Sequence, residues 1–446
     1  MREDYIYTAK NSNKRFSHYC VNELPDGDDY EPIIVDPESE GQVIIGFGGA
    51  FTDTASGALS QMNMDLQKKA MMSYFDSNIG LGYNAGRIPI GACDFSRELY
   101  SMDEEDGDES LSRFSTESDK KGIIPLIKWA KTYLKDKDEL YLYALPWSPP
   151  AWMKTNGDML HGGSLKEQHY EVMADYICKF VDEYKKEGID IRGITSQNEP
   201  DEIQNWPSCV YSEKEEKKML HLLANRTTDD NIKLLCWDSN RNHMQSRVKA
   251  LLADEYLRKE IDGVAFHGYS EGYYEELDKV HSINPDLKLC ATEFCSVKPD
   301  GDDDWYIGEK YAHDIISDLN HWTSLWLDWN LFLDENSGPK FVDNPCTSPI
   351  VLNQKEQIII YRSSYYYIGH FSRYIKRGAV RISANIQGAS KLECCAVRNP
   401  DGSFAVVIMN RTEQEKKVAV KVHSHISRVV LEPHSIGTLL LKSERQ

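Results

Sequence analysis

Two glutamates, each at the end of a predicted β-strand, carry the chemistry that this sequence indicates most specifically. Glu199 follows the apolar run at 191–196, and Glu293 lies at the end of the run at 287–294. About three strand–helix repeats separate them, so in a closed barrel of parallel strands their carboxylates would face each other across the mouth. Carboxyl groups about 5–5.5 Å apart beside a sugar ring can serve as nucleophile and acid/base of a retaining glycosidase. The spacing therefore predicts hydrolysis of a glycosidic bond by double displacement.

The residues around these glutamates support the same chemistry. Pro200 ends the strand after Glu199 and fixes the path of the chain that leaves it. Asn198 offers an amide that can bind a sugar hydroxyl or the nucleophile. Arg87 lies in an otherwise apolar strand, where an inward-pointing guanidinium needs a carboxylate partner. Glu293 is one candidate partner, and an ordinary ion pair within the barrel is an equally good alternative.

Short apolar runs alternate with longer amphipathic stretches from about residue 43 onward. Eight runs have the length and composition of strands, at residues 43–51, 83–91, 139–147, 191–196, 232–237, 263–269, 287–294 and 324–333. Eight strand–helix units in about 330 residues predict an α/β fold, a (β/α)8 TIM barrel with enlarged loops. A doubly wound sheet is the competing architecture, but it would place a glycine-rich phosphate turn after an early strand. The sequence contains no complete turn of that kind.

Amphipathic segments fill the gaps between the predicted strands. The clearest has Val172, Tyr176, Phe180 and Tyr184 at every fourth position, and Gly188 supplies a C-terminal stop. Seven further helices are predicted, at residues 59–74, 123–134, 213–224, 244–257, 273–283, 310–319 and 357–374.

After Lys376 the apolar residues alternate with polar ones, which is typical of short strands. Five strands are predicted, at residues 392–398, 404–410, 417–422, 427–431 and 437–442. The N-terminal segment contains strand-like pieces at 5–9 and 33–35, which are too few to fold alone. We therefore expect the N-terminal segment to pair with the C-terminal strands.

These patterns divide the chain into an N-terminal segment at 1–42, a catalytic barrel at 43–376 and a C-terminal β domain at 377–446. The first and third parts together are expected to form a small β-sandwich beside the barrel. A length of 446 residues is sufficient for one large domain and one smaller domain.

Composition and charge exclude several classes of partner. With 51 Lys+Arg against 71 Asp+Glu, the net charge is −20, which disfavours binding to nucleic acid and to anionic membranes. No apolar run approaches the roughly 20 residues of a membrane span, so membrane insertion is not expected. The 25 Tyr and 9 Trp exceed the needs of a core, and sugar-binding clefts use such rings as stacking surfaces.

The ten cysteines give no sign of an oxidising compartment. No CxxC pair is present, and the adjacent Cys394 and Cys395 would point to opposite faces of a strand. The N-terminal residues lack the apolar region of a signal peptide. We therefore expect reduced packing cysteines and a cytoplasmic protein.

Several motifs occur in the order typical of one enzyme family. They lie at residues 46–53 (GFGGAFTD), 83–89 (YNAGRIP), 146–157 (PWSPPAWMKTNG), 198–200 (NEP), 292–295 (TEFC), 328–330 (DWN), 399–403 (NPDGS) and 407–411 (VIMNR). With these motifs the chain resembles glycoside hydrolase family 30, and within it the glucosylceramidase (acid β-glucosidase) branch. The likeness runs in order over roughly residues 40–442.

The resemblance implies that Glu199 is the acid/base and that Glu293 is the nucleophile. It implies contact with the substrate for five further side chains, which are Asp53, Trp147, Asn198, Tyr269 and Trp329. It gives supporting roles to Arg87 and His267, and it implies neither a cofactor nor a metal. Indole rings suit the C–H face of a pyranose, and a carboxylate can accept two hydroxyl donors.

The leading hypothesis is a retaining β-glycosidase that hydrolyses β-glucosidic bonds in a small-molecule or oligosaccharide β-glycoside. β-Xylosidase and β-1,6-glucanase activities, both found among relatives, are alternatives. A carbohydrate-binding protein without activity could lose either glutamate, but both are present. A metal-dependent hydrolase could use His267 and Asp238, although no HxH or HExxH spacing supports a metal site. The exact sugar, the aglycone and the oligomeric state do not follow from these residues.

Overall fold

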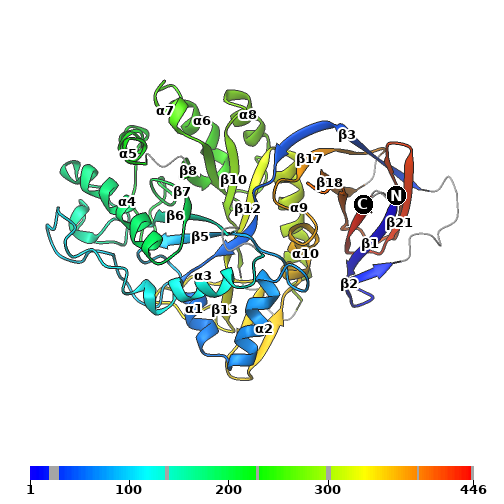
Figure 1. The fold of residues 1–446 in the computed structure, drawn as a ribbon, viewed down its shortest axis with the longest axis horizontal. Helices are drawn as coiled ribbons and strands as arrows, with labels where there is room; N and C mark the ends of the chain where they lie inside the picture. Colours follow the sequence, from blue (N-terminus) through cyan, green and yellow to red (C-terminus); the bar gives the residue numbers. More distant parts are fainter. Residues whose placement is uncertain (20–29, 136–139, 228–230, 298–302, 389–390, 443–446) are drawn as a thin grey trace.

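Eight parallel strands close into a barrel in the order β4-β5-β6-β7-β8-β9-β10-β12 (Figure 1). Their bounds are β4 Gly46–Ala50, β5 Ala85–Ile90, β6 Tyr141–Pro146, β7 Ile191–Ile194, β8 Lys233–Asn240, β9 Gly263–His267, β10 Lys288–Glu293 and β12 Thr323–Asn330. Each strand overlaps one of the eight predicted runs, and the predicted α/β barrel is confirmed. The computed structural model describes residues 1–19, 30–135, 140–227, 231–297, 303–388 and 391–442. Glu139, where the third predicted strand begins, lies outside the described residues.

Helices surround the barrel and bury their apolar faces against its strands. They are α1 Asp53–Ser60, α2 Met64–Phe75, α3 Ile123–Lys131, α4 Tyr170–Lys186, α5 Glu213–Arg226, α6 Arg241–Leu251, α7 Leu257–Glu260, α8 Glu275–Ile283, α9 Trp305–Asn320 and α10 Ser363–Ser372. Helix α4 stops just before Gly188, whose φ of +76° is readily adopted by glycine. Within the described ranges, no helix is long and apolar enough to cross a membrane.

Three of the predicted helices differ from the structure. The helix predicted at 244–257 ends at Leu251, and the short helix α7 starts separately at Leu257. The segment predicted as one helix at 59–74 belongs to two helices, because the side chain of Asn63 accepts a hydrogen bond from the backbone of Leu66 and starts α2 afresh. The segment at 357–374 begins as strand β16 (Ile358–Tyr361) before α10 starts. β16 is rich in β-branched residues and pairs with β15 (Ile350–Asn353), so pairing with a neighbouring strand overrides the helical spacing.

The rest of the chain forms a nine-stranded sheet in the order β2-β1-β22-β19-β18-β17-β3-β20-β21, folded over its own core as a β-sandwich. Its strands are β1 Arg2–Ala9, β2 Lys14–Tyr19, β3 Glu31–Val43, β17 Val380–Ile386, β18 Leu392–Arg398, β19 Phe404–Asn410, β20 Lys416–Val422, β21 His425–Leu431 and β22 Ser435–Lys442. β1 pairs with β22, and β3 lies between β17 and β20. The predicted sandwich of N-terminal and C-terminal strands is therefore confirmed. The sequence did not indicate β2 and β17, neither of which buries a full apolar face.

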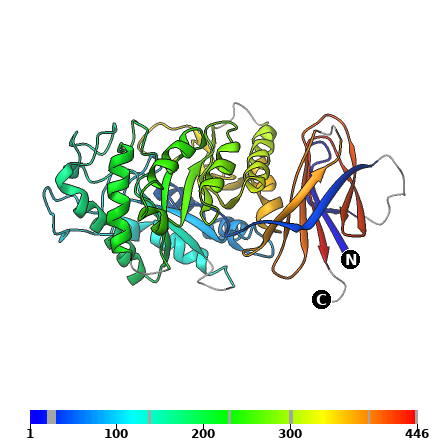
Figure 2. The ribbon, with the colours of Figure 1, turned by 90° about the horizontal axis from the view of Figure 1, so that it is seen from above.

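The sandwich packs against the barrel through α9 and α10, as both views of the ribbon show (Figures 1 and 2). At this interface the ring of His370 is fully buried between two threonines. Its Nδ1 lies 3.0 Å from the hydroxyl of Thr438, and its Nε2 lies 2.9 Å from the hydroxyl of Thr8. Burial, aided by the charge of Arg373, lowers the pKa of His370 to about 3, so the ring is neutral at physiological pH.

This buried imidazole makes the interface sensitive to acid. As the pH falls from about 6.5 toward 3, the unfolded chain takes up a proton at His370 before the folded chain does, so stability is lost over that window. We expect His370→Gln, whose amide can serve both threonines without titrating, to show a shallower decline. The free energy of urea unfolding, measured from neutral pH to about pH 4, checks this. The exposed His243→Gln variant is the control, and an equal slope for His370→Gln and the wild type would contradict the assignment.

Candidate active site

A cavity of about 360 Å³ opens at the carboxyl ends of the barrel strands and contains both predicted catalytic glutamates. The structure brings most of the predicted residues to its wall, namely Trp147, Asn198, Glu199, Tyr269, Glu293 and Trp329. Arg87 and His267 are fully buried and contact the two glutamates from within the barrel. Asp53 does not line this cavity.

The two glutamates lie close together although β8 and β9 separate their strands. Glu293 is the last residue of β10, and Glu199 follows β7. One carboxylate oxygen of each glutamate and one ring nitrogen of His267 all lie within 4.8 Å of one another. The barrel thus presents two carboxylates to one small volume, an arrangement that acid/base and nucleophilic chemistry on a sugar requires.

Arg87 is the centre of the charged network beneath the cavity. Its Nη1 donates a hydrogen bond to Oε2 of Glu293, while its Nη2 donates to Asn198 at 2.8 Å and to Asp238 at 3.1 Å. Burial alone would lower the pKa of Arg87, but the charges of Asp238 and Glu293 outweigh burial and hold it above its ordinary value. Both predicted alternatives for Arg87 are observed, because it pairs with Glu293 and also forms an ion pair with Asp238 inside the barrel.

His267 joins the second glutamate to the same network. Its Nδ1 lies 3.1 Å from Oε1 of Glu199, and its Nε2 lies 3.1 Å from Oδ1 of Asp238. Burial opposes protonation, but the charge of Glu293 and the hydrogen bonds to Asp238 and Glu199 raise the pKa of His267 to about 9. A protonated imidazole donates from both nitrogens. The cluster of Glu199, His267 and Glu293 therefore suits a site that handles protons.

The backbone is strained where these side chains meet. Glu199 has a φ of +45°, and the neighbouring residues Trp237 and Asp238 have φ values of +76° and +64°. The last two residues form an irregularity in β8, where the pairing with β9 shifts register. Side chains other than glycine adopt such conformations rarely, and they persist where surrounding contacts hold them, often at functional sites.

Aromatic rings form one wall of the cavity. The indoles of Trp147 and Trp329 are stacked, with ring centroids 5.2 Å apart and an interplanar angle of 17°. The guanidinium carbon of Arg87 lies 4.6 Å from the ring of Trp147, so this wall also covers the buried charge. Trp206 also lines the cavity, from the segment that follows the Glu199 strand. Trp206 was not among the predicted site residues.

Asp94 is a site residue that the sequence analysis missed. It follows β5, is only 5% exposed and lines the cavity together with Asn344. Nδ2 of Asn344 donates to Oδ2 of Asp94 at 2.8 Å. Burial, followed by the charge of Glu293, raises the pKa of Asp94 to about 8, so the carboxyl is protonated at neutral pH. A protonated carboxyl can donate to one sugar oxygen and accept from another hydroxyl. The feature of the sequence that could have identified Asp94 is its position just after a barrel strand.

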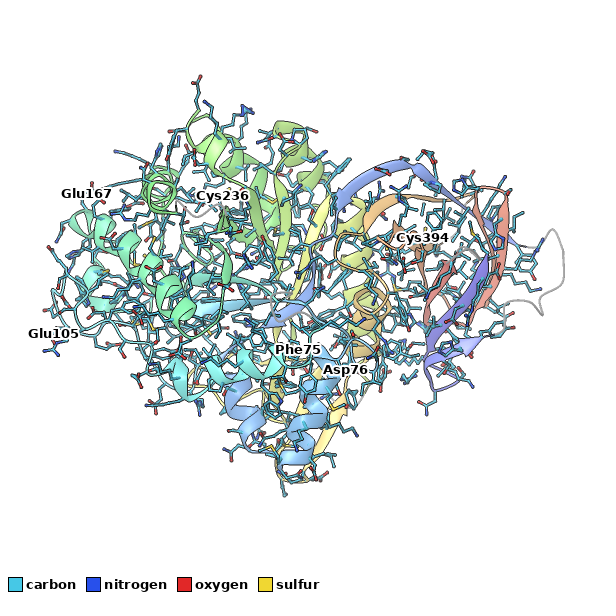
Figure 3. The ribbon with its side chains drawn as sticks, viewed as in Figure 1. Phe75, Asp76, Glu105, Glu167, Cys236 and Cys394 are labelled. Atoms are coloured by element: carbon cyan, nitrogen blue, oxygen red, sulfur yellow. The ribbon has the colours of Figure 1, made fainter. Side chains whose placement is uncertain are left out.

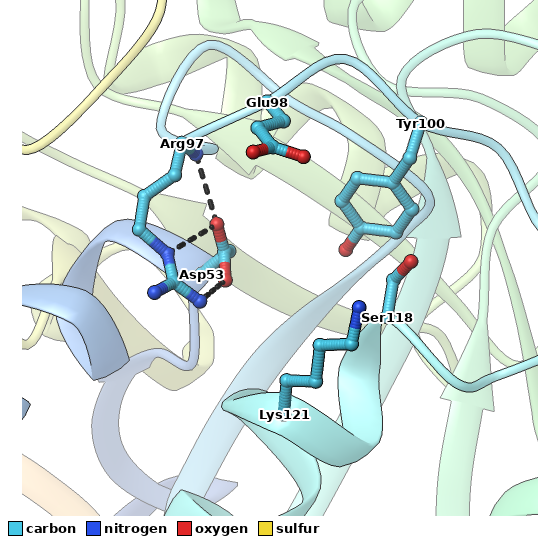
Figure 4. A pocket seen from close by; sticks show the side chains of 6 residues that line it. All are labelled: Asp53, Arg97, Glu98, Tyr100, Ser118 and Lys121. Carbon is cyan, nitrogen blue, oxygen red and sulfur yellow. Dashed lines mark hydrogen bonds and ion pairs between the residues drawn. The ribbon is translucent and has the colours of Figure 1, made fainter.

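Asp53 lies apart from the cavity that contains the two glutamates. This residue is the first of α1, and its carboxylate accepts three hydrogen bonds from Arg97, from the backbone N at 2.8 Å, Nε at 3.0 Å and Nη2 at 2.6 Å (Figure 4). It lines a separate cavity of about 210 Å³, which Tyr100 and Lys121 also border. Arg97 binds both carboxylate oxygens of Asp53, and this pairing anchors the loop after β5.

Comparison with known families agrees with this geometry. Residues 44–375 match the glycosyl hydrolase family 30 TIM-barrel domain, and residues 378–439 match the family 30 beta sandwich domain. The chain belongs to glycosyl hydrolase family 30. As a member of this family it is a glycoside hydrolase, and its substrate is a carbohydrate or glycoside.

Individual relatives of this family 30 chain have different activities in their names. The chain is 32% identical over 414 residues to the lysosomal acid glucosylceramidase of Mus musculus, a match that covers 87% of this chain and 79% of that protein. The solved structure of SrfJ from Salmonella typhimurium superposes with a TM-score of 0.93 at 30% identity, covering 99% of this chain and 100% of SrfJ. The endo-β1,6-glucanase BT3312 superposes with a TM-score of 0.89 at 26% identity, covering 99% of each chain.

The different surroundings of Asp94 and Asp53 predict different outcomes for the same substitution. Asp94→Asn replaces a carboxyl that lines the cavity and turns a second amide toward Asn344, so we expect kcat/KM to fall at least about tenfold. Asp53→Asn weakens the pairing with Arg97, so we expect lower thermal stability with kcat/KM within about threefold of the wild type. Steady-state hydrolysis of an aryl β-glucoside and thermal melts of both variants test this. A larger loss of kcat/KM in Asp53→Asn than in Asp94→Asn would restore Asp53 to the sugar site.

Proposed function

We propose that this family 30 enzyme is a retaining β-glucosidase in which Glu293 is the nucleophile and Glu199 is the acid/base. The observation that carries the proposal is the closeness of the two carboxylates, which have oxygens within 4.8 Å of each other. Retaining glycosidases have carboxyl groups about 5–5.5 Å apart, whereas inverting enzymes need about 6.5–9.5 Å to admit a water molecule. The short separation favours a covalent glycosyl–enzyme intermediate.

The contacts of Glu293 suit a nucleophile. Arg87 binds its Oε2, and the hydroxyl of Tyr269 donates to its Oε1 at 2.7 Å, so both oxygens are oriented before a sugar arrives. In the first step, Glu293 attacks the anomeric carbon and the bond to the leaving group breaks. In the second step, water attacks the same carbon and releases the sugar with its original configuration. A nucleophile that is already oriented requires little reorganisation during either step.

The contacts of Glu199 suit an acid/base. In the first step it gives its proton to the glycosidic oxygen, and in the second step it takes a proton from the attacking water. The carboxylate formed between these steps lies 3.1 Å from Nδ1 of His267. Because the pKa of His267 is raised to about 9, a positive charge adjoins Glu199 when its own negative charge develops. His267 thereby positions Glu199 without transferring a proton to the substrate.

A short β-glucoside is the substrate that we infer. The cavity is small, about 360 Å³, and combines stacked indoles with hydrogen-bonding groups from Asp94, Asn198 and Asn344. Such a lining suits a single sugar ring with part of its leaving group. The likeness to a glucosylceramidase supports glucose as the sugar, and the likeness to an endo-β1,6-glucanase favours β-1,6-glucan as the second candidate. β-Xyloside hydrolysis is the third.

A cytoplasmic location is a separate part of the proposal. The nine cysteines within the described residues are free thiols. Free thiols support a reducing compartment, because structural disulfides persist only where the environment is oxidising.

A substrate panel tests the proposed activity. We expect para-nitrophenyl β-glucoside to exceed the corresponding β-xyloside by at least about tenfold in kcat/KM, because a site that binds the extra hydroxymethyl group gains transition-state affinity. β-1,6-Gluco-oligosaccharides serve as the competing substrates. Glu293→Gln is the control for background activity and should lose at least about 10³-fold. Preferred cleavage of internal β-1,6 bonds would replace the proposal with an endoglucanase.

Leaving-group dependence tests the role of Glu199. We expect Glu199→Ala to lower kcat/KM by at least about 10²-fold for an alkyl β-glucoside and by far less for dinitrophenyl β-glucoside. The dinitrophenolate leaves without protonation, whereas an alkoxide needs a proton from the acid/base. The two rates are measured in wild type and variant at the same pH. Equal losses on both substrates would show that another residue donates the proton.

A further inference from the structure

Two cysteines lie side by side in the wall of the cavity. Cys295 follows the nucleophile Glu293 by two residues, and Cys346 begins β14 (Cys346–Thr347). Their sulfur atoms are 2.8 Å apart, and both residues line the cavity. β14 pairs in antiparallel fashion with β11 (Ser296–Val297), so backbone hydrogen bonds hold the two segments together. The sulfurs are therefore placed in contact by the fold itself.

Each thiol is connected to a group that handles the sugar. On one side, Cys295 interacts with the hydroxyl of Tyr269, which donates to Glu293 at 2.7 Å. On the other side, the backbone N–H of Cys346 donates to the carbonyl of Asn344 at 2.9 Å, and the thiol lies 3.6 Å from Oδ1 of the same residue. The amide of Asn344 in turn binds Asp94. The pair of thiols, Cys295 and Cys346, thus lies between the residues that contact Glu293 and those that contact Asp94.

The other seven cysteines within the described ranges have no comparable arrangement. Cys236 lies in the barrel and Cys394 lies in the sandwich, far from each other (Figure 3). Cys395 is adjacent to Cys394 but projects from the opposite face of β18. In the part of the chain that the structure describes, Cys295 and Cys346 are the only cysteines whose sulfurs contact each other. A bonding partner for either thiol is therefore already in place.

We propose that Cys295 and Cys346 form a modification site, at which a disulfide oxidant such as oxidised glutathione joins the two thiols and thereby slows turnover. One thiolate attacks the oxidant, which releases one reduced thiol and leaves a mixed disulfide. The second cysteine then attacks its neighbour's sulfur and releases the second reduced thiol. Two cysteine protons and two electrons leave the protein, and one molecule of oxidant is reduced to two thiols.

The effect on turnover follows from the contacts of the two sulfurs. A disulfide requires the sulfurs to approach to about 2.05 Å with a defined dihedral angle, so the two side chains must move closer than their present separation of 2.8 Å. This movement withdraws Cys295 from the hydroxyl of Tyr269 and pulls on the segment that carries Asn344. The orientation of Glu293 and Asp94 depends on those two residues. Oxidation should therefore lower kcat/KM.

The environment of Cys295 also predicts how the modification depends on pH. Contact with Cys346, followed by burial, raises the pKa of the Cys295 thiol well above its ordinary value. Since the thiolate is the attacking species, oxidation should become faster as the pH rises. A sugar bound in the cavity should slow oxidation, because both cysteines line the volume that the sugar would occupy.

The experiment treats the full chain with oxidised glutathione and follows both bonding and activity. We expect peptide mass spectrometry to find one cross-linked peptide pair that contains residues 295 and 346 and lacks the mass of two hydrogen atoms. Hydrolysis of an aryl β-glucoside should fall about fivefold in kcat/KM and recover with dithiothreitol. Cys346→Ser and Cys295→Ser should each abolish the reversible loss. Cys178→Ser, on the outer helix α4, is the matched control and should respond as the wild type does.

Three results would overturn the proposal. They are glutathione attached to Cys295 without closure onto Cys346, a disulfide that leaves kcat/KM unchanged, and an equal loss of activity in Cys346→Ser. The activity readout depends on the proposed function, whereas the mapped disulfide does not. A protein that forms the cross-link but never hydrolyses a β-glucoside would therefore refute the β-glucosidase assignment and the effect on turnover, while the modification site itself would stand.

Discussion

The pairing of the buried Arg87 guanidinium with Glu293 and Asp238 is the interaction on which the rest of the site depends. Its side chain is fully buried, and a charge in such a place is tolerated only when it is paired and hydrogen-bonded. Glu293, Asp238 and Asn198 supply the acceptors, and the ring of Trp147 covers the guanidinium. These partners come from β6, β7, β8 and β10 or the residues just after them, so they converge only when the barrel is closed. The site is therefore complete only when the barrel is closed.

Asp238 connects Arg87 to further polar groups in the interior of the barrel. Besides Arg87 and His267, it accepts hydrogen bonds from the hydroxyls of Thr195 at 3.1 Å and Thr292 at 2.6 Å. Burial raises the pKa of Asp238, but the charge of Arg87 and then the hydrogen bonds from His267 and Thr292 outweigh burial and hold the pKa well below its ordinary value. The positive-φ backbone at Asp238 costs about 1–3 kcal/mol, and this hydrogen-bond network opposes relaxation of that strain.

The outer wall of the cavity is built differently from its floor. The floor consists of strand ends, whereas the wall consists of loops held by contacts between distant parts of the chain. The hydrogen bond between Asp94 and Asn344 joins residues 250 positions apart, and the dithiol joins Cys295 to a residue 51 positions away. Loops tolerate sequence change better than barrel strands do.

The sequence by itself determined the eight strands and the residues at their ends, because strand periodicity and strand-end position are local properties of the chain. Glu199, Glu293 and Arg87 could be found in this way, and the structure places them in contact with one cavity or one network. Only the tertiary structure distinguished Asp53 from Asp94. Both are acidic residues shortly after a barrel strand, and nothing local separates them. Arg97 covers the first, while Asn344 meets the second from far along the chain. Whether such a side chain lines the cavity depends on partners from other segments of the chain. Those partners come into contact only when the loops pack in the folded protein.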